Sequence, residues 1–165
     1  MIAPASILVG TTDRTVWVRV EGKGTNANSP ELKEFGKEMT TRGYRRFVVD
    51  LKNCPLMDST FMGTLTSIAS RLKELGSGEL QIVNLNERNH NLLSDLGMIY
   101  LFSIADEAHE AAPEQSPLAP AAEDKRARKQ TMLEAHEACV AANPANEAKF
   151  KDVLEYLRQD LHLSR

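Results

Sequence analysis

A short apolar run followed by a helix-forming segment constrains the fold of this chain most strongly. Residues 46–51 read Arg-Phe-Val-Val-Asp-Leu, which is typical of a β-strand covered on both faces. From Phe61 to Leu75, apolar residues recur at alternating steps of four and three, which predicts a helix with one continuous apolar stripe. A further strand is expected at residues 79–85, so strands and helices alternate as they do in α/β proteins.

The segments on either side extend this alternation. Two stretches rich in β-branched residues are separated by a polar turn near the start of the chain, which predicts an antiparallel hairpin. The additional elements expected are strands at residues 6–9, 15–21 and 98–104 and helices at residues 29–42, 86–96 and 106–112. The fold class is therefore α/β, with a mixed, mostly parallel sheet and packed helices.

Glycine and alanine divide the chain into two regions. The last of the nine glycines is Gly97, whereas 14 of the 18 alanines lie between Ala105 and Ala148. Glycine supplies turns and alanine is the best helix former, so the two regions follow different rules. Three prolines between residues 113 and 120 mark the boundary. The expected organisation is a domain at 1–112, a Pro/Ala linker at 113–122 and a helical hairpin at 123–165.

The hairpin prediction rests on two helix-prone segments separated by Asn143-Pro144-Ala145-Asn146. The second segment carries an apolar stripe from Phe150 to Leu161. Two helices are too few to bury a core of their own. The hairpin is therefore expected to pack on the first domain, on a partner, or on a second copy of itself, which would make a homodimer.

Charge and cysteine content exclude several classes of protein. The formal net charge is -3, so the chain offers no basic field for nucleic acid or anionic lipid. The N-terminal segment lacks a basic region and its apolar run is too short for a signal peptide or a membrane span. Cys54 and Cys139 lie far apart and do not indicate a disulfide framework. The compartment expected for such reduced thiols is the cytoplasm.

No motif for catalysis, metal binding or cofactor binding is present. The four histidines are single and widely separated, without the spacing of a metal site. No glycine-rich loop has phosphate-binding spacing, and no histidine lies near Cys54 in sequence to activate its thiol. We therefore expect a protein that is not an enzyme and that needs neither a metal ion nor a cofactor.

Asp58-Ser59-Thr60 marks the start of the helix that carries the apolar stripe. Asp58 is expected to cap this helix, which places Ser59 exposed in its first turn. Free backbone N–H groups and the helix dipole favour an anion there by about 0.3–1 kcal/mol. The tripeptide is therefore either a plain helix cap or a site at which a phosphate is tolerated.

The order of elements around this tripeptide resembles the STAS domain, the fold of bacterial anti-sigma factor antagonists. The resemblance is carried by residues 47–51, by Leu56-Met57-Asp58-Ser59-Thr60 at the helix start, and by the closing segment at residues 85–104. It covers residues 5–112 and leaves the linker and the two-helix extension outside. It implies phosphorylation of Ser59 by an anti-sigma factor that doubles as a serine kinase, and removal of the phosphate by a serine phosphatase.

The resemblance also implies which residues bind partners, and the chain departs from the family pattern at two places. The expected partner-binding residues are Lys23, Asp58, Ser59, Thr60 and Met62. The glycine that usually follows the phosphorylated pair is replaced by Phe61, which either packs inward or obstructs a kinase. Gly22-Lys23-Gly24-Thr25 replaces an acidic turn. The alternative function is a phosphorylation-independent adaptor that binds through the domain or its C-terminal helices.

Overall fold

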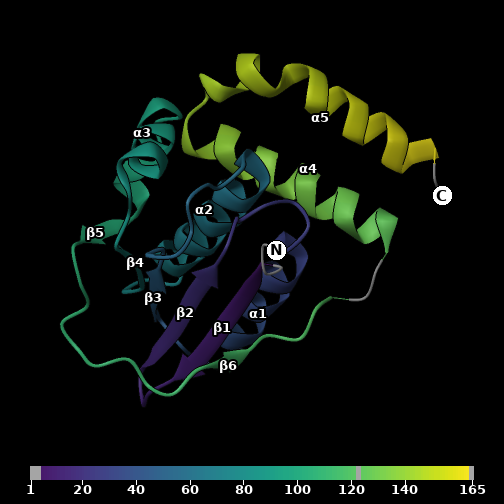
Figure 1. Ribbon diagram of the computed structural model, residues 1–165. Coiled ribbons are helices and arrows are strands. Elements are labelled where there is room, and N and C mark those ends of the chain that lie inside the picture. The colour runs from purple at the N-terminus through teal and green to yellow at the C-terminus, as the bar shows by residue number, and fades with distance from the viewer. Residues whose placement is uncertain (1–4, 122–123, 164–165) are drawn as a thin grey trace.

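The computed structural model describes residues 5–121 and 124–163 and contains a mixed six-stranded sheet in the order β5-β4-β3-β2-β1-β6 (Figure 1). The strands are β1 (Ser6–Thr11), β2 (Thr15–Glu21), β3 (Arg46–Asp50), β4 (Glu79–Val83), β5 (Ser103–Ala105) and β6 (Ser116–Pro117). The helices are α1 (Ser29–Thr41), α2 (Ser59–Glu74), α3 (Glu87–Asp95), α4 (Lys125–Ala142) and α5 (Asn146–Leu163), with a 3₁₀ turn η1 at Ile99–Leu101. The predicted α/β class is confirmed.

The sheet combines one antiparallel hairpin with parallel strands. β1 pairs antiparallel with β2, as the polar turn predicted, and β2, β3, β4 and β5 pair in parallel. β3 lies inside the sheet and its Phe47, Val48 and Val49 are all buried. Phe47 and Val49 face the main core, whereas Val48 packs with Trp17 on the opposite face. A strand buried on both faces explains its nearly continuous apolar sequence.

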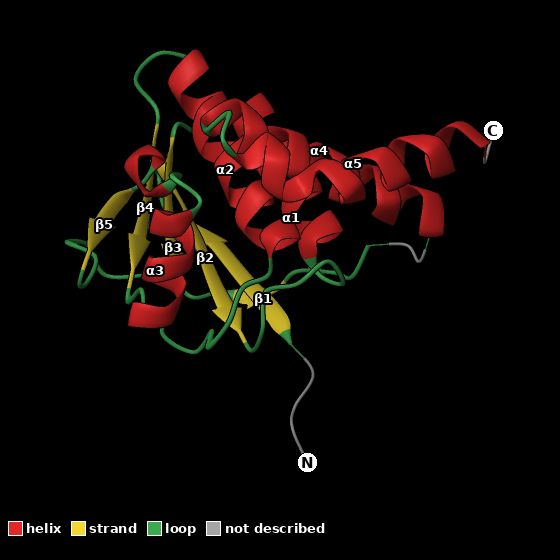
Figure 2. Cartoon of the chain, turned by 90° about the horizontal axis from the view of Figure 1, so that it is seen from above, coloured by secondary structure: helices red, strands yellow, loops and turns green. Residues whose placement is uncertain are grey.

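The helices form successive layers on one side of the sheet (Figure 2). α1 and α2 lie next to the sheet, α4 packs across α2 with a smaller contact to α1, and α5 packs on α4. Phe61, Leu65 and Leu72 of the predicted stripe are completely buried. The buried core that contains them also includes Cys139 of α4. Of the three arrangements expected for the C-terminal hairpin, the structure therefore has the one in which it packs on its own domain.

Two expected elements differ from the structure. No helix forms at residues 106–112, where the chain bends instead, because this segment has only alanine methyl groups to bury and cannot offset the cost of helix nucleation. Ala108 packs against the cluster that contains Trp17. The strand expected at residues 98–104 begins as the turn η1, and only Ser103–Ala105 pairs with β4.

Part of the linker pairs with the sheet. Its residues Ser116–Pro117 form β6, which pairs antiparallel with β1 at the edge of the sheet. The backbone N–H of Leu118 also donates to the carbonyl of Ile7. Pro117 is tolerated because an edge strand does not need every backbone N–H. Of the expected region boundaries, Met1, Ala122, Glu123 and Arg165 lie outside the described residues.

Candidate functional site

The start of α2 is held by a pair of linked loops. The Asp58 carboxylate accepts from the backbone N–H of Phe61 at 2.8 Å and from that of Asn26 at 2.9 Å. The Asp58 N–H in turn donates to the Gly24 carbonyl at 2.9 Å. The predicted N-cap is confirmed, and the same carboxylate ties the loop after β2 to the helix. The position of Ser59 is therefore fixed by hydrogen bonds from two segments.

Phe61 packs inward and does not obstruct the surface at Ser59. Its side chain is completely buried, and a Cβ built on Gly24 would lie 2.6 Å from the Phe61 ring. The aromatic ring thus occupies the space that a side chain at position 24 would need. This contact gives a structural reason for two departures from the family pattern, Phe61 in the helix and glycine at position 24 in the loop.

Ser59 contacts a histidine from the C-terminal hairpin. Its Oγ lies 2.9 Å from Nε2 of His136 in α4. The other ring nitrogen of His136, Nδ1, lies 2.7 Å from the carbonyl of Met132. A carbonyl oxygen accepts but cannot donate, so Nδ1 carries a hydrogen in this arrangement. In the neutral imidazole Nε2 is then the acceptor, and the Ser59 hydroxyl donates to it.

His136 is enclosed between α2 and α5. Its side chain is 3% exposed, and the Phe150 ring of α5 packs against it edge-on, with centroids 4.8 Å apart. Ser59 itself is half-buried, which differs from the expectation that it lies exposed in the first helical turn. The covering segment begins more than sixty residues later in the chain, so nothing local to the tripeptide could reveal it.

The Ser59–His136 pair has the residue types of a nucleophile and a base. An acyl-transfer site also needs room for a substrate next to the hydroxyl and donors aimed at a developing oxyanion. Here the imidazole is enclosed and the hydroxyl is half-buried beneath α4. The pair therefore acts as a contact between α2 and the hairpin in this arrangement.

The two helices also approach each other closely one turn after Ser59. A Cβ built on Gly63 of α2 would lie only 2.3 Å from the carbonyl oxygen of Ala135 in α4. Glycine at position 63 therefore permits direct contact between the two backbones. Ala135 is next to His136, so this contact and the Ser59 hydrogen bond together set the position of α4 over the start of α2.

The turn between α4 and α5 is attached to the segment that follows α3. Asn143 and Asn146 both donate through their side-chain amides to the carbonyl of Leu96, at 3.2 and 2.9 Å. The Tyr100 hydroxyl donates to the Ala142 carbonyl at 2.7 Å. Leu96 ends α3, where backbone carbonyls lack helical partners. The Asn-Pro-Ala-Asn segment that separates the two helices in sequence is therefore also a docking element.

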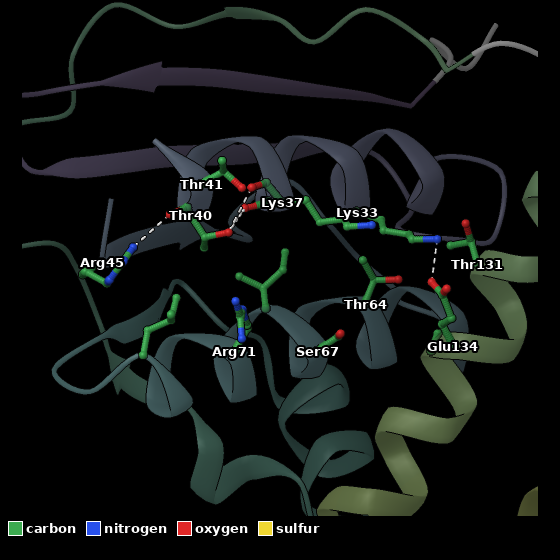
Figure 3. Close-up of a pocket in the computed structure, with 14 residues that line it drawn as sticks. Lys33, Lys37, Thr40, Thr41, Arg45, Thr64, Ser67, Arg71, Thr131 and Glu134 are labelled. Carbon is green, nitrogen blue, oxygen red and sulfur yellow. Dashed lines mark hydrogen bonds and ion pairs between the residues drawn. The ribbon is translucent and has the colours of Figure 1, made fainter. Parts of the chain in front are cut away.

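A groove lies between α1, α2 and α4 (Figure 3). Its volume is about 520 Å³, and Gly36, Ile68 and Ala135 contribute to its lining. Lys33 of α1 bridges it to Glu134 of α4 at 2.5 Å, as the dashed line in Figure 3 shows. The groove contains a third link between the hairpin and the domain, but neither Ser59 nor His136 lines it.

Two of the other cations at the groove, Arg71 and Arg45, also have partners. Arg71 lies 3.5 Å from Glu74, and Arg45 donates to the carbonyls of Thr40 and Tyr44, both at 2.9 Å. Exposed ion pairs of this kind contribute about 0–1 kcal/mol each. Of these contacts, only the Lys33–Glu134 pair joins two helices, because Arg71 pairs within α2 and Arg45 bonds to the end of α1 and the loop after it.

The five expected partner-binding residues do not form one open surface. Lys23 is exposed in the loop next to Asp58, whereas Thr60 and Met62 are each 3% exposed. A partner can reach Thr60 or Met62 only if the segments above them move. The residue that sequence reasoning missed is His136, because no spacing rule connects it to a serine 77 positions earlier.

Metal-binding clusters and membrane-spanning helices are both absent from the part of the chain that the structure describes. In the described ranges, no group of three or more His, Cys, Asp and Glu side chains is placed to hold a metal ion. None of the helices formed by residues 5–121 and 124–163 is long and apolar enough to cross a membrane.

Comparison with known proteins identifies similar folds. The family model described as "Mlab, STAS domain" matches residues 7–100. A protein of Thermotoga maritima that is described as an anti-sigma factor antagonist has a TM-score of 0.56 and 20% sequence identity. The match covers 60% of this chain and 85% of that chain. The unphosphorylated anti-sigma factor antagonist SpoIIAA matches with a TM-score of 0.53 and 13% identity over 62% and 90%.

A third structure is that of the Bacillus cell fate determinant SpoIIAA in its phosphorylated form. It has a TM-score of 0.52 and 16% identity over 62% of this chain and 93% of that chain. At these identities the likeness concerns the fold. The match to the family model ends at residue 100, before the linker and the α4–α5 hairpin.

Proposed function

The chain belongs to the STAS-domain family, and from that premise we propose that it is a non-enzymatic, cytoplasmic anti-sigma factor antagonist switched by phosphorylation at Ser59. Its partners in this proposal are an anti-sigma factor that is also a serine kinase and a serine phosphatase. One protein with a similar fold is SpoIIAA, which has been solved in unphosphorylated and phosphorylated forms.

The observation that carries the proposal is the position of Ser59 at the start of α2, directly after the Asp58 cap. Both Asp58 oxygens already accept backbone N–H groups, so a phosphate on Ser59 need not replace the cap. The helix N-terminus favours the added anion. A phosphate adds about -1.5 to -2 charge at neutral pH. It would therefore change the charge of the surface next to Lys23 and Asp58 and leave the fold of the domain itself intact.

Phosphate mapping in native cells tests this proposal. Intact-mass and peptide analysis should find a phosphate on Ser59 that Ser59→Ala abolishes and that Thr64→Ala, which removes a buried hydroxyl further along α2, does not. Binding to the anti-sigma factor should weaken about tenfold for each ~1.4 kcal/mol of repulsion that the phosphate introduces. Absence of the phosphate across growth and stress conditions, or equal affinity of both forms, would contradict the switch.

A phosphorylation-independent adaptor is the second candidate, and the hydrogen bond between Ser59 and His136 favours it. In that case Ser59 serves as a structural contact and the hairpin carries the interaction. Self-association would use the outer surface of α5, where Tyr156 is 59% exposed, because the inner face of α4 is already packed on α2. A protein that never carries phosphate but still binds its partner would support the adaptor.

A further inference from the structure

The structure points to a function for the α4–α5 hairpin. We propose that the hairpin is an intramolecular cover over the Ser59 surface of α2, and that a docked hairpin and a phosphate on Ser59 exclude each other. A kinase would reach Ser59 only when α4 lifts away, and the phosphate would then prevent α4 from returning. The inference rests on the proposed function only in taking Ser59 as the residue that is modified.

The first argument is steric. The Ser59 Oγ and His136 Nε2 are 2.9 Å apart, which is a direct hydrogen bond with no room for a phosphoryl group between the two atoms. His136 cannot move away independently, since its ring is enclosed by Phe150 and its Nδ1 is bound to Met132. A phosphate on Ser59 therefore requires either a new orientation of its own side chain or displacement of α4.

Small displacements of α4 are also resisted. The backbones of α2 and α4 meet at Gly63 and Ala135, one turn from Ser59 and adjacent to His136. Closely packed helices do not deform continuously, because a gap too small for water forfeits packing contacts without a replacement. Accommodation of a phosphate is thus expected to separate the helices as a unit and to break the Ser59 and Gly63 contacts together.

The second argument is electrostatic. The groups that contact the His136 ring are the Ser59 hydroxyl, the Met132 carbonyl and the Phe150 ring, none of which is a cation. Two cations of the hairpin are paired with carboxylates, Lys129 with Asp160 and Arg158 with Glu137, and Lys23 of the loop next to Asp58 is exposed to solvent and not enclosed in the interface. A phosphate placed in an interface without a paired cation disrupts it through repulsion and the cost of desolvation.

The two cysteines supply a built-in measurement of hairpin opening. Cys139 lies on the inner face of α4 and Cys54 lies in the loop before α2, and both are completely buried. Burial raises the pKa of the Cys139 thiol to about 12 and also raises that of Cys54. Alkylation of Cys139 without alkylation of Cys54 therefore reports opening of the hairpin, whereas alkylation of both reports unfolding of the domain.

The experiment compares the full chain with and without phosphoserine placed at position 59 by genetic code expansion. Both forms are treated with iodoacetamide, and the rate at each cysteine is measured by peptide mass spectrometry. We expect phosphoserine at position 59 to raise the Cys139 rate about tenfold or more while Cys54 stays within about twofold, tenfold being the effect of ~1.4 kcal/mol. Phosphoserine at exposed Ser77, beyond the end of α2, is the matched control and should change neither rate.

Ser59→Ala distinguishes the effect of the phosphate from the effect of losing the Ser59–His136 hydrogen bond. It removes the hydroxyl without adding bulk or charge, so its Cys139 rate should rise less than that of the phosphoserine form. Unchanged or slower alkylation of Cys139 in the phosphoserine protein would overturn the proposal, because it would mean that His136 retains the phosphate. A parallel rise at Cys54, or an equal rise in Ser59→Ala, would overturn it as well.

These outcomes do not depend on whether cells phosphorylate Ser59. A hairpin that opens on phosphoserine incorporation supports the cover even if native protein carries no phosphate. Conversely, phosphate found on Ser59 in cells together with a hairpin that stays closed would support the proposed function and refute the cover. The two proposals therefore fail separately.

Discussion

Substitution of Gly63 by alanine should open the hairpin without touching Ser59 or His136. The added Cβ would lie 2.3 Å from the carbonyl oxygen of Ala135 and 2.9 Å from its Cβ. The first atom belongs to backbone, which cannot rotate away as the end of a long side chain can. α4 must therefore move as a helix, and the neighbouring Ser59–His136 hydrogen bond is expected to lengthen with it.

The expected size of the opening depends only on the equilibrium between the docked and open positions of the hairpin. Overpacking of one methyl group costs about 1–3 kcal/mol, which corresponds to roughly a 5-fold to 150-fold rise in the open population. Alanine also has the higher helix propensity, by about 1 kcal/mol. That gain does not offset the overpacking in the docked position, because α2 is helical whether the hairpin is docked or open. Overall stability can thus change little while docking weakens.

The assay is the alkylation rate of Cys139 relative to Cys54 in native protein. In Gly63→Ala the Cys139 rate should rise by the factor above and the Cys54 rate should not. Gly36→Ala is the matched control, since its Cβ would meet the Ile68 side chain at 2.8 Å and so crowds α1 against α2, not the hairpin. Unchanged protection of Cys139 in Gly63→Ala would refute the reasoning that backbone contact at Gly63 holds α4 in place.

Three further predictions concern stability. Asp58→Ala should lower the free energy of unfolding by about 0.5–2 kcal/mol in urea titration, because the cap of α2 is lost; an unchanged midpoint would contradict this role. Removal of residues 122–165 should lower Tm and raise binding of a hydrophobic dye, since the face of α2 beneath α4 becomes uncovered; equal dye binding would argue against it. Burial raises the pKa of Cys139 from its ordinary value of 9.0 to about 12, so between these pH values the unfolded chain loses the thiol proton more readily than the folded one. The free energy of unfolding of the wild type should therefore fall above pH 9 by up to ~1.4 kcal/mol per pH unit more than that of Cys139→Ala. Equal slopes for the two proteins would exclude this contribution.

The core of the domain could be predicted because its signals are local. A strand covered on both faces at residues 46–51, a stripe that begins at Phe61, and an N-cap at Asp58 each depend on residues within a few positions of one another. The order of elements followed from these local patterns, and the family resemblance rested on that order. The helix expected at residues 106–112 failed for a related reason, since composition favoured a helix but no apolar face was present to pack it.

The surroundings of Ser59 were decided by tertiary structure. By itself the sequence determined that a C-terminal hairpin exists and that it must bury its apolar face somewhere. It did not determine where, because docking depends on complementary shapes from segments far apart: Gly63 against Ala135, the two asparagines against Leu96, and Ser59 against a histidine 77 residues away. Such contacts leave no periodic pattern in either segment. They nevertheless convert an expected exposed serine into one that a second part of the chain covers.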